Sequence, residues 1–558
     1  MCSRMKLLGV SLFFIFILYS STLFSAELNP ADRNEIQQRQ SDVIEQSKQQ
    51  RDALQQLNDI VQPPLKTDNL PAGPCFILHD IAFHHSTLLT EKDKLRLKKN
   101  YINRCINVNE INKLIHDVSN WYIERGFITS RAFIGEQNLS SGILQIEILE
   151  GKLEKITINH QQERQSAWAF PTRKDDILNL RDIEQGMEQI NRMPTQQVTI
   201  EILPGSRPGY SVVNLTRQPH IPFSANVNID NSGQKSTGEW QLNGGIGLDN
   251  IFGIADQWLL YGGHSSEFST SHNAENYQAS VSLPYGYWNL NYTYAWSRYR
   301  NAFLNQGFQW RPTGDSKTHR LSVSRVVFRN GNMKTAISVT ATHRIGDNYL
   351  NEVLLPSSSR KLSSAILGIS HSQKLWGGLA TFNPSYSRGT TWFGAEDDHD
   401  KSTDAPKAQF NKWAASASYY HPITDNISYL TTVYGQYSAR ILYGSEQVTL
   451  GGEASVRGFK EQYLSGNRGG YWRNEVNWRP LQLPVLGTLT FTAALDGGRL
   501  YNHKQDIGTA GTLWGAAVGI STANRYMTQQ VTLGWPLSYP AALKPDMAVV
   551  YYRIGISL

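Results

Sequence analysis

Apolar and polar residues alternate along much of the chain beyond residue 217. In the clearest run, 289–297, one face carries Leu290, Tyr292, Tyr294 and Trp296, and the other carries Asn, Thr, Ala and Ser. A period of two predicts β-strands. An apolar face opposite a polar one suits lipid on one side and water on the other, whereas a soluble sandwich would hide its apolar face in a core. We therefore expect a mainly β fold with a transmembrane β-barrel over residues 217–558.

Composition agrees with a barrel. After residue 26 no apolar run reaches the roughly 18 residues that a membrane-spanning helix needs, and the mean hydropathy is −0.40. The chain nevertheless holds 26 Tyr and 14 Trp, as expected if aromatic girdles line both membrane interfaces. Sixteen strands would leave about twenty-one residues for each strand and its connection, which fits strands of ~9–11 residues. The net charge of +6 gives no indication of nucleic-acid binding.

Residues 1–26 have the pattern of a secretory signal. Arg4 and Lys6 precede an apolar run, Leu7 to Tyr19, and small residues end in Ser25-Ala26. Beyond it only Cys75 and Cys105 remain. In an oxidising compartment such an isolated pair predicts one disulfide, with two buried free thiols as the alternative. Closing this loop of about thirty residues would stabilise its domain by roughly 3–4 kcal/mol.

Residues 27–58 predict one polar helix. Asn29 can cap it, Pro30 suits its first turn, and Gly is absent. Its apolar residues are too sparse to bury a full face. The helix therefore lies in water or in a water-filled lumen, or the segment is disordered. Residues 59–74 contain several prolines and predict an extended linker.

Residues 75–150 and 151–216 predict two successive α/β units that share a strand-helix-strand-strand order, which is an internal repeat. In the first unit, Phe76 to Ala82 predicts a strand and Val108 to Arg125 predicts an amphipathic helix. In the second, a helix over Leu180 to Met193 precedes strands over Val198 to Leu203 and Tyr210 to Leu215.

Two short motifs are the candidates for a functional site. Val456-Arg457-Gly458-Phe459 lies in a long polar segment, and Asp496-Gly497-Gly498 ends an alternating strand. A buried arginine requires an anionic partner, which Asp496 can supply. Alternatively Arg457 is a solvated loop residue and Asp496 forms a turn. The histidines lack the spacing of metal ligands. No G-x-S-x-G nucleophile motif occurs, and no pair of carboxylates lies in a recognisable catalytic motif. We therefore expect no enzyme activity, metal or cofactor.

The order of these segments resembles the TpsB transporters of two-partner secretion, above all the branch that secretes and activates haemolysins. The motifs that resemble the family's are Gly126-Phe127-Ile128-Thr129-Ser130-Arg131, Asp182-Ile183-Glu184-Gln185-Gly186 with Asn191-Arg192-Met193-Pro194, and Gly451 to Phe459. The resemblance implies a sixteen-stranded barrel, a plug helix over 27–58, and periplasmic POTRA domains over 75–150 and 151–216.

The resemblance also assigns roles to site residues. A sixth extracellular loop, about 442–469, would fold back into the lumen, where Arg457 would pair with Asp496 beside Gly498 on the wall. The last strand resembles the signal by which outer-membrane barrels are recognised for assembly, although most such signals end in an aromatic residue. Its residues are Arg553, Gly555, Ile556 and Leu558. The assembly machinery and outer-membrane lipids are then expected partners.

As a function, the resemblance implies export, and activation, of a large haemolysin-like exoprotein across the outer membrane without ATP. The exoprotein's N-terminal secretion domain would add a strand to an exposed POTRA sheet edge. Two alternatives remain: a BamA-type insertase, and a TpsB transporter for an adhesin or a contact-dependent inhibition toxin. A plain diffusion porin would need neither the repeats nor the polar helix.

Overall fold

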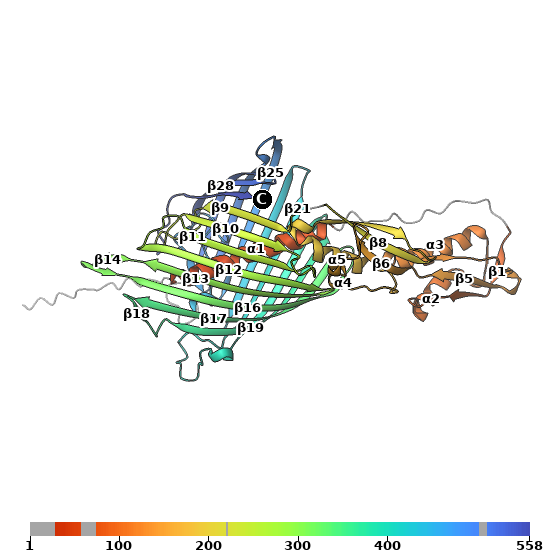
Figure 1. Ribbon diagram of the computed structural model, residues 1–558, viewed down its shortest axis with the longest axis horizontal. Helices are drawn as coiled ribbons and strands as arrows, with labels where there is room; N and C mark the ends of the chain where they lie inside the picture. Colours follow the sequence, from red (N-terminus) through yellow and green to blue (C-terminus); the bar gives the residue numbers. More distant parts are fainter. Residues whose placement is uncertain (1–27, 57–73, 219–220, 502–509) are drawn as a thin grey trace, which may run out of the picture.

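The computed structural model describes residues 28–56, 74–218, 221–501 and 510–558. The expected signal, 1–26, and nearly all of the linker, 59–74, lie outside these residues. The described chain forms a closed β-barrel, a helix inside it, and two α/β units that project from one end (Figure 1). Among the described helices, none combines the length and apolarity needed to cross a membrane.

Helix α1 (Pro30–Gln56) lies inside the barrel. It begins at Pro30 rather than at residue 27, because the Asn29 side chain accepts a hydrogen bond (2.7 Å) from the Asp32 backbone N–H and caps the first turn. Of its few apolar residues, Ile36 and Leu54 are buried.

The first α/β unit contains a three-stranded sheet in the order β2-β5-β4, with β2 and β5 parallel, and a separate β1–β3 pair. The single strand expected over 76–82 is wrong: His79 separates β1 from β2, and the two strands join different sheets. Helix α3 carries a capping box formed by Asn107 and Glu110 and buries Leu114, Val118 and Tyr122 against the sheet. The elements are β1 (Phe76–Leu78), β2 (Asp80–His84), α2 (Glu91–Lys98), β3 (Arg104–Ile106), α3 (Val108–Glu124), β4 (Arg131–Phe133) and β5 (Ile143–Leu149).

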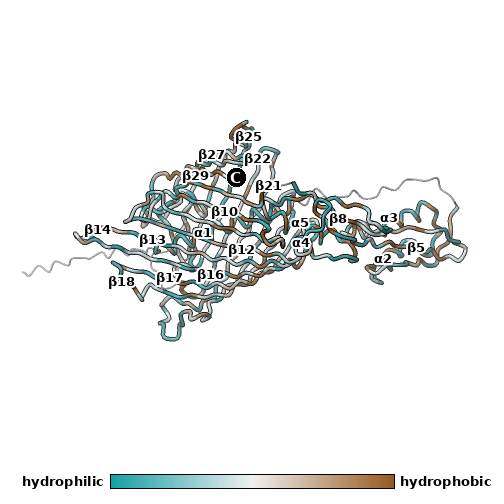
Figure 2. The backbone as a smooth tube through the Cα atoms, in the orientation of Figure 1, coloured by the Kyte–Doolittle hydropathy of each residue, from teal (hydrophilic) through white to brown (hydrophobic). Residues whose placement is uncertain are grey.

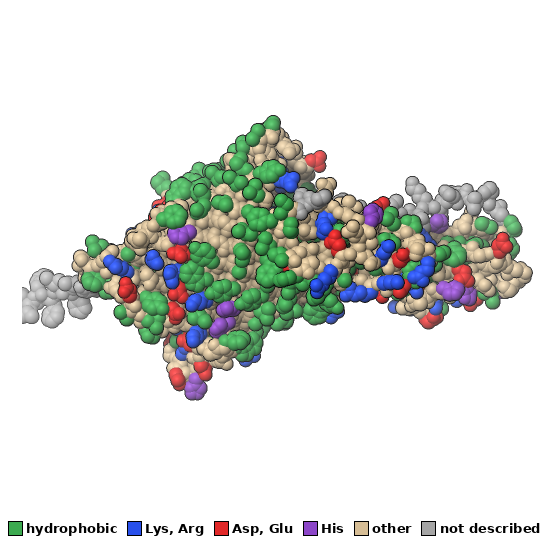
Figure 3. Space-filling view, viewed as in Figure 1, with side chains coloured by type: hydrophobic (Ala, Val, Ile, Leu, Met, Phe, Trp, Pro, Cys, Tyr) green, Lys and Arg blue, Asp and Glu red, His purple; other side chains and the backbone are tan. Residues whose placement is uncertain are grey.

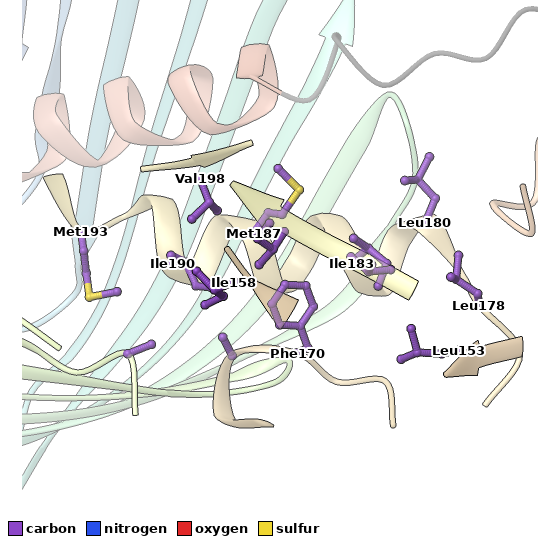
Figure 4. Close-up of a cluster of buried hydrophobic side chains, with 14 of the residues drawn as sticks. Leu153, Ile158, Phe170, Leu178, Leu180, Ile183, Met187, Ile190, Met193 and Val198 are labelled. Atoms are coloured by element: carbon purple, nitrogen blue, oxygen red, sulfur yellow. The ribbon is translucent and has the colours of Figure 1, made fainter. Parts of the chain in front are cut away.

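The second unit has a sheet in the order β6-β8-β7, again with one parallel pair. Helix α5 lies over a core that contains Phe170, Ile183 and Met187 (Figure 4). Gly186 permits this packing, because a Cβ there would overlap the Phe170 ring. The elements are β6 (Lys152–Ile158), α4 (Arg164–Ala169), α5 (Leu180–Asn191), β7 (Val198–Pro204) and β8 (Tyr210–Arg217).

Sixteen long antiparallel strands form the barrel wall, and the two-residue β18 (Val353–Leu354) extends one of them. The last strand closes the barrel by pairing Arg553 with Asp230 and Ser557 with Asn226 of the first. The long strands are β9 (Phe223–Asp230), β10 (Gln241–Asp249), β11 (Gln257–Ser265), β12 (His272–Tyr285), β13 (Trp288–Asn301), β16 (Pro312–Arg329), β17 (Met333–Leu350), β19 (Arg360–Leu375), β20 (Gly378–Thr390), β21 (Asn411–Pro422), β22 (Ile427–Ser438), β25 (Gly469–Leu483), β26 (Gly487–Leu500), β27 (Gly511–Ala523), β28 (Met527–Ser538) and β29 (Val549–Ser557).

Apolar side chains cover the outer wall. On β13, Trp288, Leu290 and Tyr292 are exposed, and hydropathy alternates along the wall strands (Figure 2). In the space-filling view apolar side chains dominate the barrel surface, while charged ones gather on the α/β units and toward the opposite end (Figure 3). At that opposite end the hairpin of β14 (Phe303–Asn305) and β15 (Phe308–Trp310) extends beyond the wall (Figure 1).

Candidate functional site in the barrel lumen

The segment between β22 and β25 turns inward instead of forming a simple hairpin. Within it β23 (Val448–Leu450) pairs with β24 (Leu464–Gly466). Val456 and Phe459, on either side of Arg457, are fully buried in an apolar cluster that includes Leu450, Tyr471 and Leu513. This packing fixes the loop tip against the inner wall.

Arg457 and Asp496 form the centre of the site. Asp496 is fully buried and Arg457 is 5% exposed. Arg457 Nε lies 2.6 Å from Asp496 Oδ2, and a terminal guanidinium nitrogen lies 2.7 Å from Oδ1. The Arg457 backbone N–H also donates to Oδ2 at 3.1 Å. The carboxylate therefore holds both the side chain and the backbone of the loop tip.

A second carboxylate completes the cluster. Glu475 on β25 lies 2.9 Å from Arg457 and 2.8 Å from Arg473. Two cations thus face two anions, which offsets the cost of burying each charge. Sequence reasoning missed Glu475. The signal was present, because Arg473 and Glu475 alternate with the outward-facing Trp472 and Val476.

Glycines in the wall make room for the loop tip. A Cβ on Gly515 would overlap the Arg457 carbonyl oxygen, and one on Gly534 would lie 2.8 Å from the Gly458 backbone nitrogen. Gly458 itself has φ +99°, which disfavours any L side chain. Gly498, expected to leave space beside Asp496, instead accommodates Leu450, whose Cδ2 would lie 2.9 Å from an added Cβ.

Helix α1 is held in the lumen by polar contacts with the wall. Asp32 pairs with Arg344 at 3.1 Å, Glu35 with Arg320 at 3.7 Å, and Arg51 donates to Ser418 at 2.7 Å. These partners belong to three different strands, β17, β16 and β21. The sequence indicated a polar environment for this helix but not its partners.

The helix also touches the inward loop. Arg33 pairs with Glu461 at 3.3 Å, and Gln40 donates to the Thr449 carbonyl at 2.9 Å. A polar cavity of about 510 Å³ lies among the helix, the loop tip and the seam strands β9 and β29. Another, of about 730 Å³, lies between the helix and the end that carries the α/β units. The helix and the loop therefore both lie in the polar interior of the barrel, with these cavities beside the helix.

An ionic junction joins α5 to the barrel rim. Arg329 on β16 lies 3.4 Å from Glu184 and 2.7 Å from Glu188, and Lys334 pairs with Glu188. Burial alone would raise the pKa of Glu188, but Lys334 and Arg329 outweigh it and hold that pKa at about 2. Burial also lowers the pKa of Arg192, which donates to the Ala255 carbonyl at 2.6 Å, to about 10.

The remaining sequence candidates lie apart from the loop tip, except Arg553. Cys75 and Cys105 form a disulfide in the first α/β unit. Arg553 faces inward on β29, 3.8 Å from Asp230 and 3.7 Å from Glu453. Gly555 lies against Thr528, whereas Ile556 and Leu558 are exposed on the outer face. No group of residues in the described ranges has the arrangement of a metal site.

The barrel has a polar lining, an inward loop and an internal helix, and two α/β units project from one end. Together these features define an outer-membrane transporter bearing POTRA domains. The family model of the haemolysin secretion/activation proteins ShlB/FhaC/HecB matches residues 209–522, and POTRA models match 76–151 and 152–204. The chain belongs to this family. It is a TpsB transporter of the outer membrane, with its POTRA domains in the periplasm.

Individual relatives refine this assignment. The chain is 68% identical to the outer membrane transporter CdiB of Dickeya dadantii over 98% of both chains. The solved structure of CdiB from Escherichia coli shares 48% identity and a TM-score of 0.91, covering 96% of this chain and all of that one. Identity with the hemolysin transporter ShlB of Serratia marcescens is 30%, over 96% of this chain and 97% of that one.

Proposed function

We propose that this transporter exports the large exoprotein of a contact-dependent inhibition system. The observation that carries the proposal is 68% identity, over essentially the whole chain, with a CdiB transporter, against 30% with ShlB. The haemolysin cargo favoured by the sequence resemblance is therefore less well supported than its alternative. The helix and the loop inside the polar interior of the barrel support export by a pore that must rearrange.

We infer that the cargo first meets the POTRA domains. In the first unit, β4 is an edge of the sheet β2-β5-β4, and Phe133 on β4 and Ile134 directly after it are exposed. An extended chain can add to such an edge through main-chain hydrogen bonds, while these side chains select apolar residues. The Ala132 N–H on the outer side of β4 donates to Ser119 Oγ at 3.0 Å, a bond that an added strand must replace. Phe133→Ser combined with Ile134→Ser removes the exposed apolar side chains without removing a backbone N–H of the β4–β5 pair, and cargo binding by this variant tests the assignment.

In this mechanism the loop tip and the helix act together. Arg457 and Asp496 anchor the loop to the wall, and α1 fills the channel through contacts with wall and loop. Export requires α1 to leave these contacts, which are polar pairs that water can replace. Folding of the cargo outside the cell supplies the direction of movement.

The test is a cargo exchange. The transporter is coexpressed with the N-terminal secretion domain of a contact-dependent inhibition exoprotein, and separately with that of a haemolysin, each fused to the same reporter. We expect the first reporter alone to reach the cell surface and medium. Export of the haemolysin fusion with equal or greater yield would refute the proposed cargo, and a barrel without POTRA domains serves as the inactive control.

A further inference from the structure

A row of small residues crosses the outer wall of the barrel. The strand registers place Pro384 opposite Ala415, Ala415 opposite Gly435, and Gly435 opposite Gly470. Directly paired residues share a face of a sheet. Their neighbours at alternate positions, Trp413, Tyr437, Val433 and Trp472, are all exposed on the outer face. The row therefore faces the membrane.

Pro384, Ala415 and Gly435 line a shallow, open groove. Its volume is about 790 Å³, and its lining includes Trp413, Tyr437 and Tyr501 as well as the small residues. A Cβ added to Gly435 would meet nothing within 4 Å. An apolar groove of this size suits a lipid acyl chain better than a bulky side chain.

The groove lies toward the extracellular end of the wall. β21 begins at Asn411, β22 ends at Ser438 and β25 begins at Gly469, all on the side away from the POTRA domains. Tyr386 and Trp413, whose rings lie 4.6 Å apart, flank it. Aromatic residues at this position mark the membrane–water interface. The groove is therefore open to the outer leaflet.

Two arginines stand at the end of the row. Arg499 on β26 pairs directly with Gly470 and is exposed, with its guanidinium 5.1 Å from the centroid of the Tyr501 ring. Arg468 lines the groove itself. An apolar groove with the exposed Arg499 guanidinium at one end complements an amphiphile with an acyl chain and a phosphate headgroup.

We propose that this groove binds lipid A, the phosphorylated glycolipid of the outer leaflet, with one acyl chain along Ala415, Gly435 and Gly470 and a phosphate against Arg499. The position of the groove toward the extracellular end of the wall favours lipid A, which lies in the outer leaflet, over the phospholipids of the inner leaflet. The site depends on the outer-membrane location of the protein but not on the identity of the exported cargo.

The test compares variants in lipid binding. The full-length protein, extracted in mild detergent and freed of lipopolysaccharide, is titrated with purified lipid A or with phosphatidylglycerol and followed by native mass spectrometry. Gly435→Leu places a side chain in the groove, and its Cβ would meet nothing within 4 Å. Val433→Leu, at the next outward-facing position of β22, is the matched control, and Arg499→Gln removes one headgroup contact. Heat-modifiable migration verifies that each variant is folded.

We expect Gly435→Leu to weaken lipid A binding about tenfold, the effect of withdrawing roughly two methylene groups from the groove. Arg499→Gln should weaken lipid A binding as well, and Val433→Leu should leave it unchanged. Equal binding by the wild type and Gly435→Leu would overturn the proposal. So would equal affinity for phosphatidylglycerol, or a lipid-free dimer abolished by Gly435→Leu, which would make the groove an interface between two copies.

Discussion

At the scale of single residues, the loop tip is held by a compensated charge cluster rather than by one ion pair. Arg457 contacts both Asp496 and Glu475, and Glu475 also binds Arg473. The wall glycines admit the backbone of the tip, so geometry as well as charge selects its position. The sequence indicated the pair Arg457–Asp496 because each lies in a recognisable motif. The alternation along β25 marked Glu475 as facing the lumen but not as a partner of Arg457, and nothing indicated Gly515 or Gly534, because these contacts depend on how distant strands and the loop come together.

We predict that Arg457→Ala leaves an inserted, heat-modifiable barrel but lowers export at least about tenfold. Removal of the guanidinium leaves the buried Asp496 carboxylate without its cation, while Glu475 retains Arg473. Leaving one charge of a buried pair without its partner can cost ~3–5 kcal/mol in a dry site and less in a wet lumen. Arg457→Lys should be intermediate, because an ammonium cannot bind Asp496 through two parallel hydrogen bonds. The measurement is secretion of the cognate exoprotein. Wild-type export by Arg457→Ala would contradict the role assigned to the contact between Arg457 and Asp496.

The double reversal Arg457→Asp with Asp496→Arg provides the complementary measurement. It should restore export only in part, since Glu475 would then face a new carboxylate at residue 457. Combining the reversal with Glu475→Gln should recover more. Full recovery by the reversal alone would mean that Glu475 does not contribute to the site.

At the scale of elements, the strands were more predictable than the short helices. Alternation of lipid-facing and lumen-facing residues repeats along every wall strand, so the barrel could be inferred from local sequence. Helix α2 was missed because Glu91–Lys98 has no buried residue and hence no apolar face. Helix α1 was predictable as a polar helix. Its docking was not, because its ion pairs with β16 and β17 leave no periodic signal.

The junction between α5 and the barrel should weaken in acid. The pKa of Glu188 in the folded protein, about 2, lies below its ordinary value of 4.5. A depressed carboxyl pKa stabilises the folded state above about pH 4.5, and this stabilisation disappears as the pH falls toward 2. We predict that the second POTRA domain becomes more susceptible to acid-active protease in this window.

Glu188→Gln tests whether protonation of Glu188 causes this increase in protease susceptibility. The variant should show increased susceptibility already at about pH 5, where the protease is still active and wild-type Glu188 is ionised, and little further change down to about pH 3, because the titrating group is absent. Glu201→Gln, on β7 of the same domain, is the matched control. An acid response of Glu188→Gln equal to that of the wild type would assign the pH dependence to other groups.

At the scale of the whole molecule, helix α1 and the inward loop both lie inside the barrel, and two polar cavities lie beside the helix. We predict that deleting residues 27–58 increases the single-channel conductance of the purified protein in planar bilayers. The physical reason is that α1 occupies the lumen and is held by charged pairs rather than by an apolar core.

Asp32→Asn combined with Glu35→Gln should retain the helix but increase the frequency of brief openings, since both anchoring carboxylates are neutralised. Glu45→Gln is the control, because Glu45 bonds Gln49 within the same helix. A deletion variant with the conductance of the wild type would show that α1 does not plug the channel and that the inward loop alone closes it.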